Sequence, residues 1–119
     1  MSAPRFAPRD FTTSPPDFGS VARLTWACTE GDQHDLDRLA ASQLQHSYAV
    51  VIRRKVKLQY KTLNKYCAAA DIPTDRFGKM LGGKLLMRFE DTVRAERLLG
   101  QIHADAINLM AKVVAAHNR

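Results

Sequence analysis

Histidines and cysteines are the residues of this 119-residue chain with the most versatile chemistry. They bind metals or act in catalysis where their spacing brings several of them together. The histidines are His34, His46, His103 and His117, and the cysteines are Cys28 and Cys67. The histidines show no metal-ligand spacing, and the two cysteines form no CxxC motif. We therefore expect no metal site or cofactor, and both cysteines reduced and packed.

Other short patterns also fall short of a catalytic site. Gly82-Gly83-Lys84 is too short for a phosphate-binding loop, and the chain contains no GxxxxGK[ST], GxSxG or HExxH. His103 and Asp105 stand two positions apart, so on a helix they face different directions. Glu90-Asp91 suits the first turn of a helix better than a catalytic acid, because negative charge is favourable there. We expect the protein not to be an enzyme.

The stretch Thr62–Gly83, TLNKYCAAADIPTDRFGKMLGG, predicts two short helices joined by a tight turn. The first helix has an apolar stripe of Tyr66, Cys67 and Ala70, and the second one of Phe77, Met80 and Leu81. The turn falls at Asp71-Ile72-Pro73, because the residue before a proline disfavours the α conformation. Thr74 or Asp75 is the expected N-cap of the second helix, and Gly82-Gly83 ends it.

This stretch resembles the helix-turn-helix of the phage-repressor or Xre-like family. The matching positions are Tyr66, Cys67, Ala70, Asp71, Ile72, Phe77, Met80 and Gly83. Asp71 stands where the family usually has glycine, and Cys67 where it usually has alanine; aspartate can adopt the left-handed conformation and cysteine is small. The resemblance covers Val50–Gly100, and the segment MLGGKLLMRFED most resembles immunity repressors of temperate phages.

The resemblance implies that the second helix enters the DNA major groove. It places Thr74, Asp75 and Lys79 at base edges, where lysine reads guanine and aspartate accepts from cytosine. Thr62, Arg76, Lys84 and Arg88 would contact phosphates, which fix register without reading sequence.

Positive charge is concentrated around the same stretch. The net charge of +6 arises from residues 50–119, which hold 14 Lys and Arg against 6 Asp and Glu, whereas residues 1–49 hold 4 against 6. Such charge suits a nucleic-acid backbone, and a solvated surface is the alternative. Arg53 and Arg54 end a long predicted helix, where they suit the helix dipole or a DNA backbone.

The remaining chain predicts an all-α domain of four to six helices over residues 18–119, after a flexible arm over residues 1–17. The proline-rich arm reads as a tail, although Arg5 and Arg9 could reach a minor groove. The expected helices are a short one within Phe18–Gly31, a long one from Asp35 to about Val56 or Leu58, one from about Glu90 to Leu99 and one over Gln101–His117. Thr25, Trp26 and Thr29 also suit a strand, and Trp26 is expected to anchor this piece to the core.

The last predicted helix carries an apolar stripe that includes Leu109, Met110, Val113 and Val114. The stripe could pack on the domain's own core or form the interface of a homodimer, since operator-binding proteins are commonly symmetric. No apolar run is long enough for a membrane span, and the first residues lack an apolar signal core, so we expect a cytoplasmic, nucleoid-associated protein without a membrane partner.

Together these features predict a sequence-specific regulator that binds double-stranded DNA, most similar to a phage immunity repressor. A protein-interaction module on the same fold, such as an antitoxin or accessory factor, is the alternative. RNA binding is a weaker third possibility, because the sequence shows no aromatic platform for base stacking.

Overall fold

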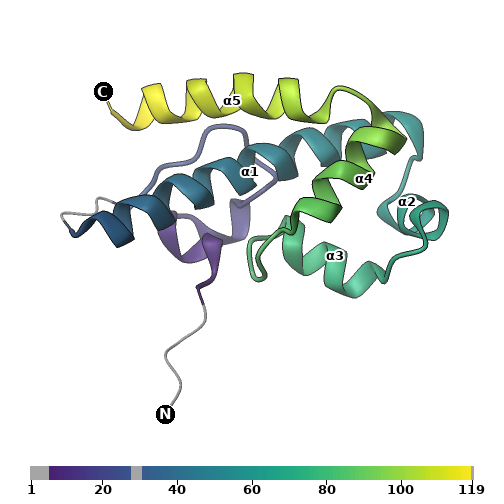
Figure 1. Ribbon diagram of the computed structural model, residues 1–119, viewed down its shortest axis with the longest axis horizontal. Coiled ribbons are helices and arrows are strands. Elements are labelled where there is room, and N and C mark those ends of the chain that lie inside the picture. Colours follow the sequence, from purple (N-terminus) through teal and green to yellow (C-terminus); the bar gives the residue numbers. More distant parts are fainter. Residues whose placement is uncertain (1–5, 28–30, 119) are drawn as a thin grey trace, which may run out of the picture.

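A long helix, α1 (Gln33–Gln59), runs through the middle of the molecule, and the other helices pack around it (Figure 1). The computed structural model describes residues 6–27 and 31–118. The further helices are α2 (Leu63–Ala70), α3 (Thr74–Leu81), α4 (Phe89–Leu99) and α5 (Ile102–His117). The described residues contain no strand beyond a single antiparallel bridge between Thr12 and Trp26. The predicted all-α class is confirmed.

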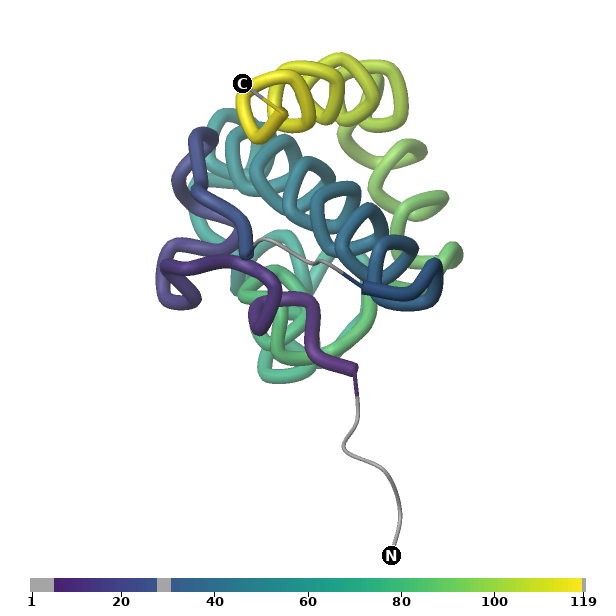
Figure 2. Tube along the Cα trace, turned by 90° about the vertical axis from the view of Figure 1, so that its left-hand side faces the viewer, coloured from purple at the N-terminus to yellow at the C-terminus, as the bar shows by residue number. Residues whose placement is uncertain are grey.

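The helix α1 begins where the sequence offers a cap. The Asp32 carboxylate accepts a hydrogen bond from the Asp35 N–H at 3.0 Å, which satisfies one of the free donors at the helix start. Its 27 residues span about 40 Å at 1.5 Å per residue. α5 lies along one side of α1, and α3 lies on the opposite side; both views agree on this order (Figures 1 and 2).

Two groups of buried side chains form the core. The larger group joins α1 to α2, α3, α4 and α5 and includes Ile52, Tyr66, Phe77, Met80 and Ile102. The smaller group consists of Phe18, Trp26, Leu39 and Val113. Leu109 of α5 packs against both groups and so connects them.

The segment before α1 differs from the prediction. Residues 18–27 form turns and extended chain instead of the expected helix, and residues 28–30 lie outside the described part. Gly19 has φ +76°, and a Cβ on it would lie 2.1 Å from the Leu81 carbonyl oxygen. Contacts of this segment with α1 and α3 therefore outweigh its local helical pattern. Trp26 is buried, as predicted.

Residues 6–17, from the predicted flexible arm, also pack on the domain. They form two 3₁₀ turns, Pro8–Phe11 and Pro15–Asp17, and Pro8 is buried. The Arg9 N–H donates to the Gly83 carbonyl at 3.0 Å, which fixes this segment beside the end of α3. The arginine is thus part of the folded domain, whereas Arg5 lies outside the described residues.

The apolar stripe of α5 contributes to the domain's own core. Val113 is 5 % exposed and packs with Phe18, Trp26 and Leu39, and Leu109 packs against both core groups. Met110 and Val114 are half-buried. Val113 is therefore mainly a core residue, which corrects the predicted dimer surface at this position.

His46 of α1 holds the segment before the helix in place. Its Nδ1 accepts from the Gly19 N–H at 2.9 Å, so the proton of the neutral ring lies on Nε2, which faces the Ala22 carbonyl at 3.3 Å. Phe18 and Trp26 pack edge-on against the imidazole ring. Burial lowers the pKa of His46 below its ordinary value of 6.5, and the backbone carbonyls of Ala22 and Val21 counteract this only in part.

We predict that the free energy of unfolding falls as the pH drops below about 6.5. Only the unfolded chain readily protonates this histidine, so acid favours unfolding, by at most about 1.4 kcal/mol per pH unit for one proton. His46→Asn removes the titrating group and is expected to flatten this slope between pH 7 and 5 in urea unfolding, although the variant is less stable overall. The exposed His34→Asn is the control, and an unchanged slope in His46→Asn would contradict the assignment.

Candidate nucleic-acid interface

The helices α2 and α3 are joined by the three residues Asp71, Ile72 and Pro73. The Thr62 hydroxyl accepts from the Lys65 N–H at 3.2 Å and so caps α2. Asp71 has φ 57° and ψ 50°, the left-handed conformation expected of an aspartate in this turn. Pro73 is the N-cap of α3 and no side chain caps that helix, so the predicted cap at Thr74 or Asp75 is wrong.

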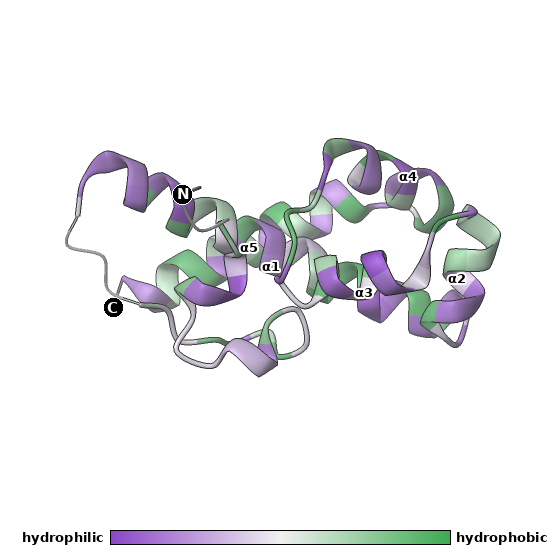
Figure 3. Cartoon of the chain, turned by 90° about the horizontal axis from the view of Figure 1, so that it is seen from below, coloured by the Kyte–Doolittle hydropathy of each residue, from purple (hydrophilic) through white to green (hydrophobic). Residues whose placement is uncertain are grey.

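The inner face of α3 is fully packed, and its outer face is open. Phe77, Met80 and Leu81 are buried, as their spacing predicts. Asp75, Gly78, Lys79 and Gly82 fall on the opposite side of the helix at about 3.6 residues per turn. We call these four residues the outer face of α3. Figure 3 shows the molecule from below, with hydrophilic and hydrophobic residues alternating along α3.

A glutamine of α1 fixes the position of α3 and of the linker that follows it. The amide nitrogen of Gln45 donates to the carbonyl oxygens of Met80 at 2.9 Å and Leu85 at 2.8 Å. Its amide oxygen accepts from the Met87 N–H at 2.8 Å. One buried side chain, with its own polar atoms satisfied, thus binds three backbone groups. The outer face of α3 is therefore presented by a rigid support.

Arg76 connects α3 to α4 through a buried carboxylate. Its guanidinium donates to both oxygens of Asp91, at 3.2 and 3.1 Å, and Asp91 is 1 % exposed. Asp91 also accepts from the Arg88 N–H at 2.9 Å and from Arg94 at 3.3 Å. Burial alone would raise the pKa of Asp91, but these hydrogen bonds and the charge of Arg76 hold it below its ordinary 3.8. The predicted phosphate contact at Arg76 is thus replaced by a structural ion pair.

The three predicted base-reading residues differ in their orientation. Asp75 and Lys79 are exposed and form an ion pair at 3.2 Å one helical turn apart. Thr74 is half-buried beside the thiol of Cys67. Asp75 and Lys79 therefore remain available to a ligand, whereas the Thr74 side chain is turned toward α2. Burial raises the pKa of the Cys67 thiol, and the neighbouring Thr74 hydroxyl opposes this shift in part.

Gly78 is a feature of the outer face that the sequence prediction did not include. A Cβ built at this position meets no atom within 4 Å beyond its chain neighbours and the adjoining helix backbone, so nothing else in the described part of the chain requires glycine there. Glycine in the middle of a helix costs about 1 kcal/mol relative to alanine. Close approach of a ligand to the backbone is one reason for such a glycine.

Several exposed polar groups flank α3. Thr62, Lys84 and Arg88, three of the predicted phosphate contacts, are exposed. Arg88 forms an exposed ion pair with Glu90, at 3.4 Å. The prediction omitted Lys61 and Lys65, which are also exposed, at the start of α2. Their position on either side of Thr62 was the available signal in the sequence.

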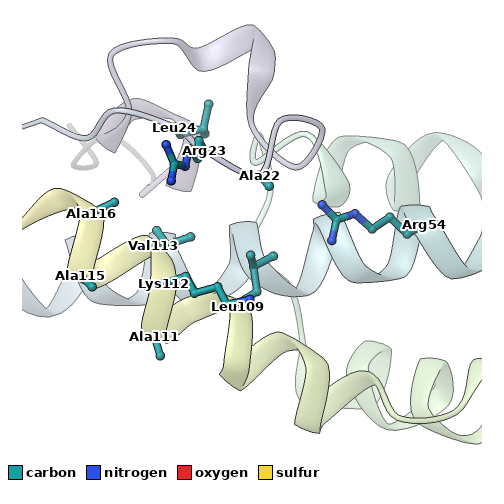
Figure 4. A pocket seen from close by; sticks show the side chains of 10 residues that line it. All are labelled: Ala22, Arg23, Leu24, Arg54, Leu109, Ala111, Lys112, Val113, Ala115 and Ala116. Carbon is teal, nitrogen blue, oxygen red and sulfur yellow. The ribbon is translucent and has the colours of Figure 1, made fainter.

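Arg54, near the end of α1, is not part of this surface. Arg54 lies at the edge of a groove formed mainly by α5 and the segment Ala22–Leu24, on the side of α1 opposite α3 (Figures 1 and 4). Arg53 is half-buried, and burial lowers the pKa of its guanidinium. A cluster that looks continuous in the sequence is therefore divided between different sides of the helix.

The groove beside Arg54 is a second candidate surface. It has a volume of about 530 Å³, and alanines, Leu24, Leu109 and Val113 make much of its wall apolar. Arg23, Arg54 and Lys112 provide its positive charge, and Figure 4 shows these side chains around it. None of the three forms an ion pair within the part of the chain that the structure describes. The groove therefore suits an acidic, partly apolar segment.

The residues considered for catalysis lie apart. Among residues 6–27 and 31–118, no three His, Cys, Asp or Glu side chains lie close enough to hold a metal ion. His103 Nδ1 is 2.7 Å from the Tyr48 hydroxyl, and Asp105 pairs with Lys55 at 3.0 Å. Cys67 is buried and free, while Cys28 is outside the described residues. No helix in the described part is long and apolar enough to cross a membrane.

Comparisons with protein-family models, with curated proteins and with solved structures found no match to this chain. The function is therefore inferred from the residues themselves.

Proposed function

We propose that the protein binds double-stranded DNA in a sequence-dependent way and regulates transcription as a repressor that occupies an operator. The observation that carries this proposal is the outer face of α3, which is open, polar and rigidly supported beside α2. An exposed helix of this kind fits the major groove, where Lys79 can donate to guanine acceptors and Asp75 can accept from cytosine. Occupying the operator requires no chemistry by the protein.

The charges around α3 support the same proposal. Lys61, Lys65, Lys84 and Arg88 are exposed and are close in sequence to the ends of α2 and α3. Positive side chains of this kind neutralise phosphates and release counterions, which supplies affinity without reading sequence. Asp71 and Asp75 are the only acids between Arg53 and Arg88.

The direct test is a selection of genomic fragments by the purified chain, followed by anisotropy titrations against selected and random duplexes. We expect the selected fragments to share a sequence and to bind at least about tenfold tighter than random DNA. Equal affinity for both would leave only non-specific binding. Absence of any binding would favour the second candidate function.

The second candidate is a protein-interaction module, and the groove at Arg54 favours it. Its apolar wall and its three cations, which have no ion pair among the described residues, suit an acidic amphipathic helix of another protein. Arg54→Glu would then abolish capture of such a peptide without affecting DNA. Peptide capture without any DNA binding would establish this candidate instead.

The Gly78→Ala variant distinguishes an effect on folding stability from an effect on DNA binding. Alanine is expected to raise the free energy of unfolding by about 0.5–1 kcal/mol, because it is the better helix former and has open space around its methyl group. The same methyl group would obstruct the approach of DNA, so operator affinity should fall by about tenfold, or 1.4 kcal/mol. Thermal melts and anisotropy titrations measure the two effects. Unchanged affinity in the stabilised variant would remove this part of α3 from the interface.

A salt titration of DNA binding distinguishes cations that contact phosphates near α3 from cations elsewhere on the surface. Lys84→Ala is expected to reduce the slope of log K against log salt concentration by about one unit, because one phosphate contact is lost. Arg54→Ala carries the same loss of charge on the other side of α1 and should retain the wild-type slope. Equal slopes for the two variants would show that Lys84 does not meet a phosphate.

A further inference from the structure

The outer side of α4 exposes apolar side chains that nothing in the described chain covers. Phe89 is 92 % exposed and Val93 is 60 % exposed, and Leu86, just before the helix, is also exposed. The opposite side of α4 is buried through Asp91, Thr92, Ala95 and Leu99. A contiguous exposed group that includes an aromatic ring marks an interaction surface more often than a single exposed residue does.

Charged residues flank this apolar group in a particular order. At about 100° per residue, Glu90 and Arg97 lie on the same side of Val93, one a turn before it and the other a turn after it. Both are exposed. Arg97 has no ion pair among the described residues, and Glu90 has only the surface pair with Arg88. The α4 face is defined here as Phe89, Glu90, Val93 and Arg97.

We propose that a second copy of this chain docks on the α4 face with its own α4 antiparallel. A two-fold axis that crosses α4 at right angles beside Val93 brings the two Val93 side chains together. The same rotation places Glu90 opposite the partner's Arg97, and Arg97 opposite the partner's Glu90. Two ion pairs therefore form around an apolar centre, as an isologous interface requires.

The charge order is what selects a second copy as the occupant. A uniformly acidic or basic partner would meet a like charge at Glu90 or Arg97, and like charges in an interface disfavour it. An antiparallel copy pairs both residues. Glu96, on the Phe89 side of the stripe, accepts from the His103 N–H at 3.0 Å, so its carboxylate is already engaged at the start of α5.

The extent of the face indicates a weak association. Stable interfaces bury about 800 Å² per partner, and a single face of the 11-residue α4 falls below this. Because Asp91 of α4 is tied to Arg76 of α3, pairing through α4 would also fix two α3 helices relative to each other. That consequence rests on the proposed DNA-binding function, whereas the self-association itself does not.

Complementary charge reversals test the pairing by sedimentation velocity of the full chain. We expect the wild type to dimerise at high concentration, and Glu90→Arg and Arg97→Glu each to associate at least about tenfold more weakly. Each homodimer of a variant would face two like-charge contacts.

An equimolar mixture of the two variants should regain the wild-type dimer, because Glu90→Arg carries arginine at both positions and Arg97→Glu carries glutamate at both. Every contact of the heterodimer then joins opposite charges. Both residues are exposed, so circular dichroism should show wild-type folding.

Control variants define which results overturn the proposal. Leu58→Gln changes another exposed apolar residue, on α1, and should leave the dimer unchanged, while Phe89→Gln should weaken it. A monomeric wild type at millimolar concentration, a mixture that stays monomeric, or an equal effect of Leu58→Gln would each refute docking through α4. A dimer that binds no DNA would refute the proposed function alone, and DNA binding by a strictly monomeric chain would refute only the pairing.

Discussion

Replacing Asp91 with alanine is expected to lower the free energy of unfolding by about 1.5–3 kcal/mol, a large part of the stability of a small domain. The change leaves the guanidinium groups of Arg76 and Arg94 without their shared carboxylate, and it removes the acceptor for the Arg88 N–H. The side chains of Arg76 and Arg94 are partly exposed, so water solvates their charges in part after the change, and the main loss is that of the charged hydrogen bonds. Urea unfolding of the variant measures the effect.

Glu90→Ala is the matched control for this prediction. It removes a carboxylate from the neighbouring position, where the pair with Arg88 is exposed, and should cost about 0.5 kcal/mol or less. The native pKa of Asp91 lies below the unfolded value, so its stabilising effect is present above about pH 4 and is lost as the pH falls through the native pKa. A loss in Asp91→Ala no larger than in Glu90→Ala would contradict the role assigned to the buried pair.

Local patterns were sufficient to predict the helices on either side of the turn. The spacing of Tyr66 and Cys67, then of Phe77 and Met80, identifies the buried sides of α2 and α3. Pro73 and the left-handed Asp71 set the break between them. These signals act within a few residues along the chain, and such signals can be read without knowing the rest of the fold.

The segment Phe18–Gly31 shows where local patterns fail. Val21, Leu24 and Ala27 have helical spacing, yet the described part of this segment contains no helix. Gly19 donates to His46, and Trp26 pairs with Thr12, so the partners stand 27 and 14 positions away. Packing with distant residues can override a weak local preference, and no pattern within the segment identifies those partners.

Only part of the candidate site could be predicted from the sequence, for a related reason. Counting charges predicted a basic region around α3, but a count does not show which way each side chain points. Arg76 pairs with Asp91, 15 positions away, and Arg54 faces α5 instead of α3. Gly78 gave no signal until the space around it was known. The sequence thus indicates which stretch matters, and the fold determines which of its residues are free.

Replacing Val113 with aspartate is expected to lower the free energy of unfolding by at least about 3 kcal/mol. The change removes a buried aliphatic side chain, a loss of about 1.5–3 kcal/mol, and places a carboxylate against Phe18, Trp26 and Leu39, where it loses most of its hydration. A surface role for the α5 stripe predicts a different outcome, a folded monomer with weakened self-association. Urea unfolding and sedimentation together distinguish the two.

Ile107→Asp provides the comparison on the same helix. Ile107 is 56 % exposed, so the same kind of substitution should cost less than about 1 kcal/mol and leave the chain folded. If Val113→Asp unfolds the chain and Ile107→Asp does not, Val113 belongs to the core, and a dimer must form through another surface such as the α4 face. If Val113→Asp instead stays folded with near wild-type stability, the packing of α5 against Phe18 and Trp26 is wrong, and α5 again becomes the candidate interface.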